Sequence, residues 1–370
     1  MKRYGFPVAA VLAFTLGFTG VALAKGHSAR SHHHRSAPAA ARGFAHSLIP
    51  GFAPHPRAWL RALSELPRNP KSPHKAKPPR KPAPKRQAPK QQPRPRHQLN
   101  ATTLSIYEQT VKPRFLSAQG CRAARRHESG VVVLDFGKPA FEHGGYGSIL
   151  FSGRFAPNHK ITAAMLRYAR AYVDCLPKGS TASIELARGT SNYHPSVPSA
   201  YAAGVHWARE TNKLGRELHR RWLGAHVEAA AADDAEPAWD RQFRKTRQFF
   251  HGFRAAVHGH TLFDYGSLDG GVGAIWSARQ AWYVAGGLRH TKALPEIYNS
   301  SMAQEWAELA RIARGRYHRG VHFAGVMTQG SSSCHCGFRP PTAHRALAQA
   351  LGAQGVGHVL LPLGGTNIIG

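Results

Sequence analysis

The feature that most constrains this chain is an alternation of short apolar runs with stretches of helical period. The runs of strand type lie at residues 131–134, 182–186, 226–229, 261–263, 281–284, 294–298, 321–327 and 358–361. Helical stripes between them include Ile161, Met165, Tyr168 and Tyr172, and then Leu214, Leu218 and Trp222. Strands that alternate with helices favour a parallel sheet, and eight of them over about 270 residues match a barrel in number and size. We therefore predict an α/β fold, a (β/α)₈ TIM-like barrel, with a doubly wound open sheet as the main alternative.

The first 24 residues have the three parts of a signal peptide. Lys2 and Arg3 precede an apolar run from Phe6 to about Leu23, and Ala22-Leu23-Ala24 supplies small residues for cleavage. Gly17 and Gly20 interrupt the run, which argues against an uncleaved membrane anchor. We expect residues 1–24 to be removed near Ala24 and the protein to be secreted or held in the cell envelope.

Residues 25–98 have a composition that excludes a packed core. They contain 17 lysines and arginines, one acid (Glu65) and 14 prolines. Like charges repel, and proline removes backbone donors, so the segment is predicted to be a disordered, basic, Pro-rich tether. It would adhere to anionic surface polymers outside the cell, and the alternative is a solubilising spacer. Export makes cytosolic nucleic acid an unsuitable partner.

Residues 99–370 are predicted to form the folded domain, and they hold all four cysteines. Cys121 and Cys175 flank the first strand–helix unit and are the candidates for a disulfide in an oxidising compartment. Cys334 and Cys336 are one residue apart and favour a loop staple or a redox-labile pair over a metal site. No His-Glu-x-x-His spacing occurs, so neither a metal nor a cofactor is expected.

Polar and aromatic side chains follow the predicted strands at the point where each strand ends. They are Asp135, Asn192, Tyr193, Asp234, Glu236, Trp239, Asp264, Tyr265, Glu296, Tyr298 and Gln329. The carboxyl ends of parallel strands form the active face of such folds, so these side chains predict one concave site. Each acid taken alone also fits a structural pairing or a solvated loop position.

These segments resemble the glycosidase-type (β/α)₈ barrels, in particular uncharacterised secreted bacterial members, over roughly residues 128–330. The resemblance is carried by residues 134–137, 189–193, 234–236 with Trp239, 264–266, 295–298 and 327–329. The Asp-x-Glu at Asp234 and Glu236 is similar to that of muramidase-type and chitinase-type barrels, which implies that Glu236 is the proton donor and that Asp234 positions it or the substrate. Two departures stand out: the pair follows the third predicted strand rather than the fourth, and the longer chitinase-type acidic run is absent.

Glycoside hydrolysis requires one carboxylic acid to protonate the leaving oxygen and a second carboxylate to attack or to activate water. We assign the first role to Glu236, with Asp234 beside it, and the second to Glu296 as nucleophile or base. The expected substrate-binding residues are Asp135, Asn192, Tyr193, Trp239, Asp264, Tyr265, Tyr298 and Gln329. The predicted function is a secreted glycoside hydrolase-like protein acting on cell-wall or extracellular polysaccharide. The alternatives are a non-catalytic glycan-binding barrel and an adhesion protein held at the cell surface by its polybasic tether.

Overall fold

The computed structural model describes residues 102–369, apart from residue 318 and the segments 330–336 and 358–363. The predicted signal peptide, the tether of residues 25–98 and residues 99–101 lie outside the described residues. The predicted strand at 358–361 and the pair Cys334 and Cys336 also lie outside them.

Eight parallel strands follow one another around a ring in chain order. They are β1 (Thr103–Tyr107), β2 (Gly130–Asp135), β6 (Ile184–Ser191), β7 (Val227–Asp234), β8 (Leu262–Asp264), β9 (Thr291–Ala293), β10 (Val326–Thr328) and β11 (Gly365–Ile369). The first and last strands pair, with Thr103 opposite Thr366. Single bridges from Ala293 to Phe323 and from Glu296 to Met327 join the β9 and β10 segments, so the ring is nearly closed. The fold is an α/β TIM barrel, as predicted, and not an open sheet.

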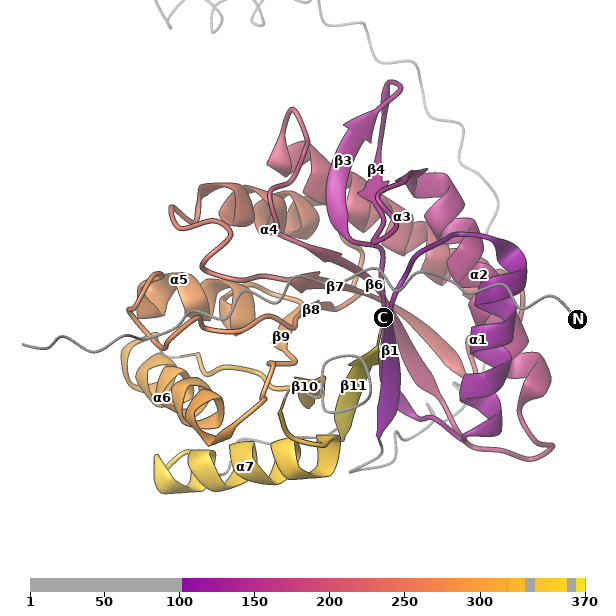
Figure 1. The fold of residues 1–370 in the computed structure, drawn as a ribbon. Helices are drawn as coiled ribbons and strands as arrows, with labels where there is room; N and C mark the ends of the chain where they lie inside the picture. The colour runs from indigo at the N-terminus through magenta and orange to yellow at the C-terminus, as the bar shows by residue number, and fades with distance from the viewer. Residues whose placement is uncertain (1–101, 318, 330–336, 358–363, 370) are drawn as a thin grey trace, which may run out of the picture. The chain divides into compact units, whose positions relative to one another are not determined.

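A helix lies in each connection between consecutive strands, and the helices surround the ring (Figure 1). They are α1 (Pro113–Arg125), α2 (Asn158–Cys175), α3 (Ala200–Arg220), α4 (Arg244–Ala256), α5 (Ala278–Trp282), α6 (Ser300–Tyr317) and α7 (Pro340–Ala353), with a π-helical turn η1 (Tyr283–Gly287) after α5. A small antiparallel sheet is inserted between β2 and α2; its strands are β3 (Lys138–Glu142), β4 (Gly145–Ile149) and β5 (Phe155–Pro157). Among the described residues, none of the helices is long and apolar enough to cross a membrane.

The strands alternate between two apolar layers, as successive side chains of a strand must. On β2, Val131 and Val133 belong to the cluster inside the barrel, whereas Val132 and Leu134 pack against the surrounding helices. The helical stripe predicted for α2 is fully buried in that outer layer, where each large side chain stabilises the fold by about 1.5–3 kcal/mol.

A disulfide joins Cys121 of α1 to Cys175 at the end of α2, the pair expected from the sequence. Its Cα atoms are 5.1 Å apart, within the usual range for disulfides. Gly120 lets the two helices approach, because a Cβ at this position would lie 2.2 Å from the carbonyl oxygen of Tyr168. The bridge therefore reinforces a close helix contact on the outside of the barrel.

The structure differs from the strand predictions in several places. Strands β1 and β11 were not predicted, β9 ends before the run predicted at 294–298, and the run at 281–284 is not a strand. Strand β1 was not predicted, although Leu104 and Ile106 alternate with polar neighbours, because it directly follows the basic, Pro-rich segment. The run at 281–284 is helical, since Ser277 and Gln280 form a reciprocal capping box that starts α5 and continues into η1. Its bulky apolar residues resemble a strand only when the helix start before them is overlooked.

Two helix details also differ from expectation. Trp222 lies beyond α3 and is 88% exposed rather than part of its buried stripe. At α6 the backbone N–H of Met302 donates to Oδ1 of Asn299, so Asn299 begins the helix and not the Ser301–Gln304 pair that the sequence suggested.

Candidate active site

Strand alternation decides which acids face the barrel interior, here called the lumen. On β7, Ala230 and Ala232 belong to the interior apolar cluster, so Asp234 points into the lumen and Asp233 points away from it. On β8 the interior residues are Phe263 and Tyr265.

Asp264 lies between Phe263 and Tyr265 and is therefore on the outer face of its strand. It is buried near Asp233 of the neighbouring strand. Burial holds the pKa values of both aspartates well above the ordinary range, and repulsion by Asp264 raises that of Asp233 further. One carboxyl oxygen of each has no hydrogen-bond partner among the described residues. This placement does not bring Asp264 to a sugar in the lumen, in contrast to its predicted role.

Four carboxyl groups converge on the lumen: Asp135, Asp234, Glu236 and Glu296, called the lumen carboxyls below. Burial, with the charge of Asp269 next, raises the pKa of Glu236 to about 7. Burial and then repulsion by Glu236 raise the pKa of Glu296 to about 8. Burial holds the pKa of Asp234 well above its ordinary range, with added repulsion from Glu296 and then Glu236. Because these groups repel one another, they share one space and cannot all ionise near neutral pH.

Hydrogen bonds fix two of the lumen carboxyls. The Tyr298 hydroxyl donates to Oε1 of Glu296 at 2.5 Å. Asp135 accepts the Tyr265 hydroxyl at 2.7 Å and the backbone N–H of Gly137 at 2.8 Å. Asp135 and Tyr265 are both buried, so this hydrogen-bonded pair forms the bottom of the lumen site and the ring of Tyr265 is not exposed to a sugar. Burial raises the pKa of Asp135 to about 7, and these two bonds oppose that rise.

Asn192 fixes the backbone of Glu236. Its Nδ2 donates to the carbonyl oxygen of Glu236 at 2.9 Å, and its Oδ1 accepts the N–H of Glu236 at 3.0 Å. The same amide donates to Thr246 Oγ1 at 3.0 Å. Because these bonds occupy both ends of the amide, Asn192 is a positioning residue for Glu236 rather than a sugar ligand.

Tyr193 and Trp239 lie on the loops after β6 and β7, with ring centroids 5.3 Å apart in an edge-to-face arrangement. Tyr193 is 46% exposed and carries Lys138 Nζ 5.6 Å from its ring centroid. Trp239 comes three residues after Glu236 in the chain. The two rings offer apolar faces at the rim against which a sugar ring can pack.

Sequence reasoning missed Tyr107, the last residue of β1. Its hydroxyl accepts a hydrogen bond from Nε2 of Gln329, which was a predicted binding residue. The ring of Tyr107 packs against the apolar cluster inside the barrel. Burial raises the pKa of Tyr107, and the charges of Asp234 and Glu296 raise it further. The polar–apolar alternation of residues 103–107 was the signal that could have found it.

The missed strand also changes the position of the Asp-x-Glu pair. Counting from β1, strand β7 is the fourth strand of the barrel and not the third. The pair at Asp234 and Glu236 thus follows the strand that the glycosidase resemblance implies. Among the described residues no group of histidine, cysteine, aspartate and glutamate side chains is arranged to hold a metal ion.

No protein-family model matches the chain, and no curated protein matches it either. Among solved structures it is similar to one described as the complex structure of a GH113 beta-1,4-mannanase, with 8% identity and a TM-score of 0.34 over 73% of this chain and 88% of the other. So distant a likeness has no bearing on function, and the barrel fold rests on the strand pairing itself.

Proposed function

We propose that this protein is an exported glycoside hydrolase that acts on cell-wall or extracellular polysaccharide by carboxylate acid/base catalysis. The observation that supports this most is the convergence of Glu236 and Glu296 on one lumen, with the pKa values of both raised to near neutrality. Glycoside hydrolysis needs one protonated and one ionised carboxyl, and two interacting groups that titrate near pH 7 supply that state.

Glu236 is the more exposed of the two and lies beside the Tyr193–Trp239 rim, so we assign it the transfer of a proton to the leaving oxygen. Glu296 then attacks the sugar or activates water, and the Tyr298 hydroxyl stabilises its ionised form. Because burial raises the pKa of both groups and their charges interact, a second assignment exchanges the two roles. Interacting groups titrate as a pair, so kinetics must decide between the assignments.

The test is release of reducing ends from polysaccharide by Glu236→Gln and Glu296→Gln, with Glu228→Gln at the opposite end of the barrel as the matched control. Each active-site variant is expected to lose about 10²–10⁴-fold in kcat, as removal of a general acid or base does, and the control to lose little. A substrate with a good leaving group needs no proton donor, so it will restore turnover in the acid variant alone. Unchanged turnover in both variants contradicts the proposal.

A binding protein without catalysis is the second candidate, and one observation favours it: Glu296 and Asp234 are only 4% and 6% exposed. In that case the wild-type protein releases no reducing ends, but Tyr193→Ala and Trp239→Ala weaken its affinity for polysaccharide.

Adhesion through residues 25–98 is a separate proposal, supported by their cationic composition. Deletion of those residues should release the protein from washed cells at low salt, where screening is weakest. Unchanged retention of the deletion variant contradicts it.

A further inference from the structure

A cavity with a volume of 680 Å³ lies at the end of strand β1. Its walls come from the end of β1 and the loop that follows it (residues 106–112), from Phe115 and Gln119 of α1, from the segment around β5 (residues 150–156) and from Lys160. Tyr107 is one of the residues that line this cavity, its ring packs against the apolar cluster inside the barrel, and its hydroxyl accepts a hydrogen bond from Gln329. The cavity therefore lies at the carboxyl end of β1, the same end of the barrel as the lumen carboxyls.

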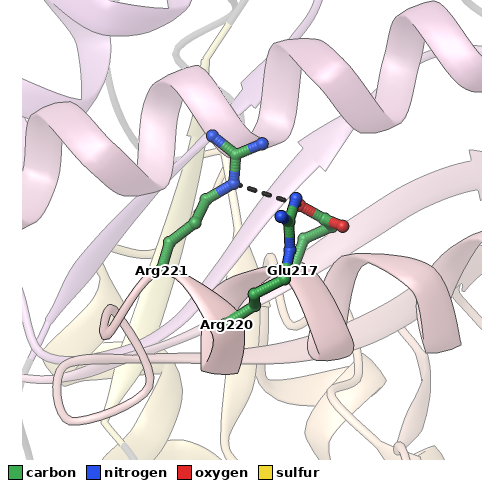
Figure 2. A network of polar contacts seen from close by, with 3 residues as sticks. All are labelled: Glu217, Arg220 and Arg221. Carbon is green, nitrogen blue, oxygen red and sulfur yellow. Dashed lines mark hydrogen bonds and ion pairs between the residues drawn. The ribbon is translucent and has the colours of Figure 1, made fainter.

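The cavity is cationic. Lys112, Arg154 and Lys160 line it, are exposed, and make no ion pair with any described residue. The arginines at the end of α3 differ: Glu217 accepts hydrogen bonds from Arg220 at 2.5 Å and from Arg221 at 3.1 Å (Figure 2).

The one acid in the cavity wall does not cancel these charges. Glu108 is only 1% exposed, and burial raises its pKa to about 8, so its carboxyl is mostly neutral at pH 7. One oxygen of Glu108 and the amide oxygen of Gln119 have no hydrogen-bond partner among the described residues. The floor of the cavity is thus polar but uncharged, beneath a rim of three cations.

The remaining wall suits a sugar ring. Phe115 is 46% exposed, and Phe155 lines the same cavity. Apolar ring faces and polar edges together match a pyranose, whose faces are apolar and whose hydroxyls point outward. The cationic tether is a poor occupant, because its charge has the same sign as the rim.

We propose that this cavity binds an anionic sugar unit of the substrate, next to the unit held by the lumen carboxyls, so that the polysaccharide is acidic. The shared chemistry is a ring with a carboxylate or an acidic ester opposite Lys112, Arg154 and Lys160. This proposal rests on the proposed function in that one glycan spans both spaces.

The experiment measures calorimetric affinity of the full-length chain carrying Glu236→Gln, which prevents turnover, for short oligosaccharides of equal length. One is a uronate, one carries sulfate esters and one is neutral. The variant Lys112→Gln/Arg154→Gln/Lys160→Gln is expected to bind the uronate or the sulfated ligand about tenfold more weakly, since each partly exposed charge contributes modestly. It should bind the neutral ligand unchanged.

The control variant is Arg220→Gln/Arg221→Gln in the same chain, which keeps the tether and lowers the surface charge elsewhere. Selective loss for the uronate identifies a carboxylate, and selective loss for the sulfated ligand identifies an ester. Equal losses in the triple and control variants, or equal binding of acidic and neutral ligands by the parent chain, overturn the proposal. Turnover that survives both Glu236→Gln and Glu296→Gln overturns the hydrolase proposal and leaves this binding result standing.

Discussion

The two ends of the barrel both carry buried polar side chains, but these make different contacts. At the carboxyl ends of the strands, buried carboxyl groups repel one another, and one oxygen of Asp234 has no partner among the described residues. At the opposite end lies a hollow of 500 Å³ whose walls include His226, His260 and Glu228. The deeper contrast is in what each polar group binds.

The histidines at the amino ends of the strands, here called the lower end of the barrel, form hydrogen bonds with backbone carbonyl oxygens. His226 Nδ1 lies 2.8 Å from the carbonyl oxygen of Ala182, and His260 Nδ1 lies 3.0 Å from that of Ala229. The ring of His260 also fills the space above Gly215, where a Cβ would lie 2.5 Å from it. These contacts hold the starts of the strands together, and this end of a (β/α)₈ barrel contributes to stability rather than to chemistry. The comparison teaches that a cluster of buried carboxyl groups that repel one another, and not the size of a hollow, marks the candidate site.

A matched pair of asparagines tests this contrast. Asn192 bonds both backbone groups of Glu236, and Asn212 likewise bonds the carbonyl oxygen of Ala256 at 2.8 Å and the N–H of His258 at 2.9 Å. Each Asn→Ala change leaves buried polar groups unpaired and should lower the free energy of unfolding by about 1–3 kcal/mol. Only Asn192→Ala should also lower kcat, by about tenfold or more, because it releases the backbone of Glu236.

Urea unfolding and reducing-end assays on both asparagine variants measure the two effects. Equal losses of kcat in the two variants would show that Asn192 acts through stability alone.

The second way to sharpen the comparison is the pH dependence of stability. The folded pKa values of Glu108, Asp135 and Glu296, about 8, 7 and 8, exceed those of the unfolded chain, about 4. Each of these carboxyl groups therefore binds its proton more tightly in the folded protein. Its contribution to the free energy of unfolding is lost as the pH rises from about 5 toward 8. The loss is at most about 1.4 kcal/mol per pH unit for each group.

The urea concentration at the midpoint of unfolding should therefore decrease as the pH is raised from 5 to 8. The decrease should be smaller in Glu108→Gln, because glutamine does not titrate. Glu228→Gln at the lower end is the matched substitution. An unfolding midpoint that increases from pH 5 to pH 8 contradicts the assignment of buried, protonated carboxyl groups to the carboxyl ends of the strands.

Much of the fold was readable from the sequence because the buried strands are long or clearly apolar. Strands β2, β6 and β7 and the buried stripe of α2 gave unambiguous patterns. The errors arose where a pattern was short or aromatic. Strand β1 has five residues beside a Pro-rich segment, and the Trp282–Tyr283 stretch reads as a strand unless the Ser277 cap is noticed.

The site was predictable at the level of strand ends but not of strand faces. Glu236, Glu296 and Asp234 meet in the lumen, but the alternation of side chains along a strand does not say which set faces inward until the neighbouring strands are known. Asp264 was assigned inward for that reason. The role of Asn192 depends on a contact between residues 44 positions apart in the chain, which no local pattern reveals.

The most direct test of the central claim is an NMR titration of the side-chain carboxyl carbons of Glu236 and Glu296, which needs no knowledge of the substrate. The account predicts that both groups titrate well above the ordinary glutamate pKa of about 4.3. It also predicts that Glu236→Gln lowers the pKa of Glu296, because the repulsion between them is removed. Titration of both groups near 4.3, or a pKa of Glu296 that ignores the Glu236→Gln change, would contradict a shared catalytic pair.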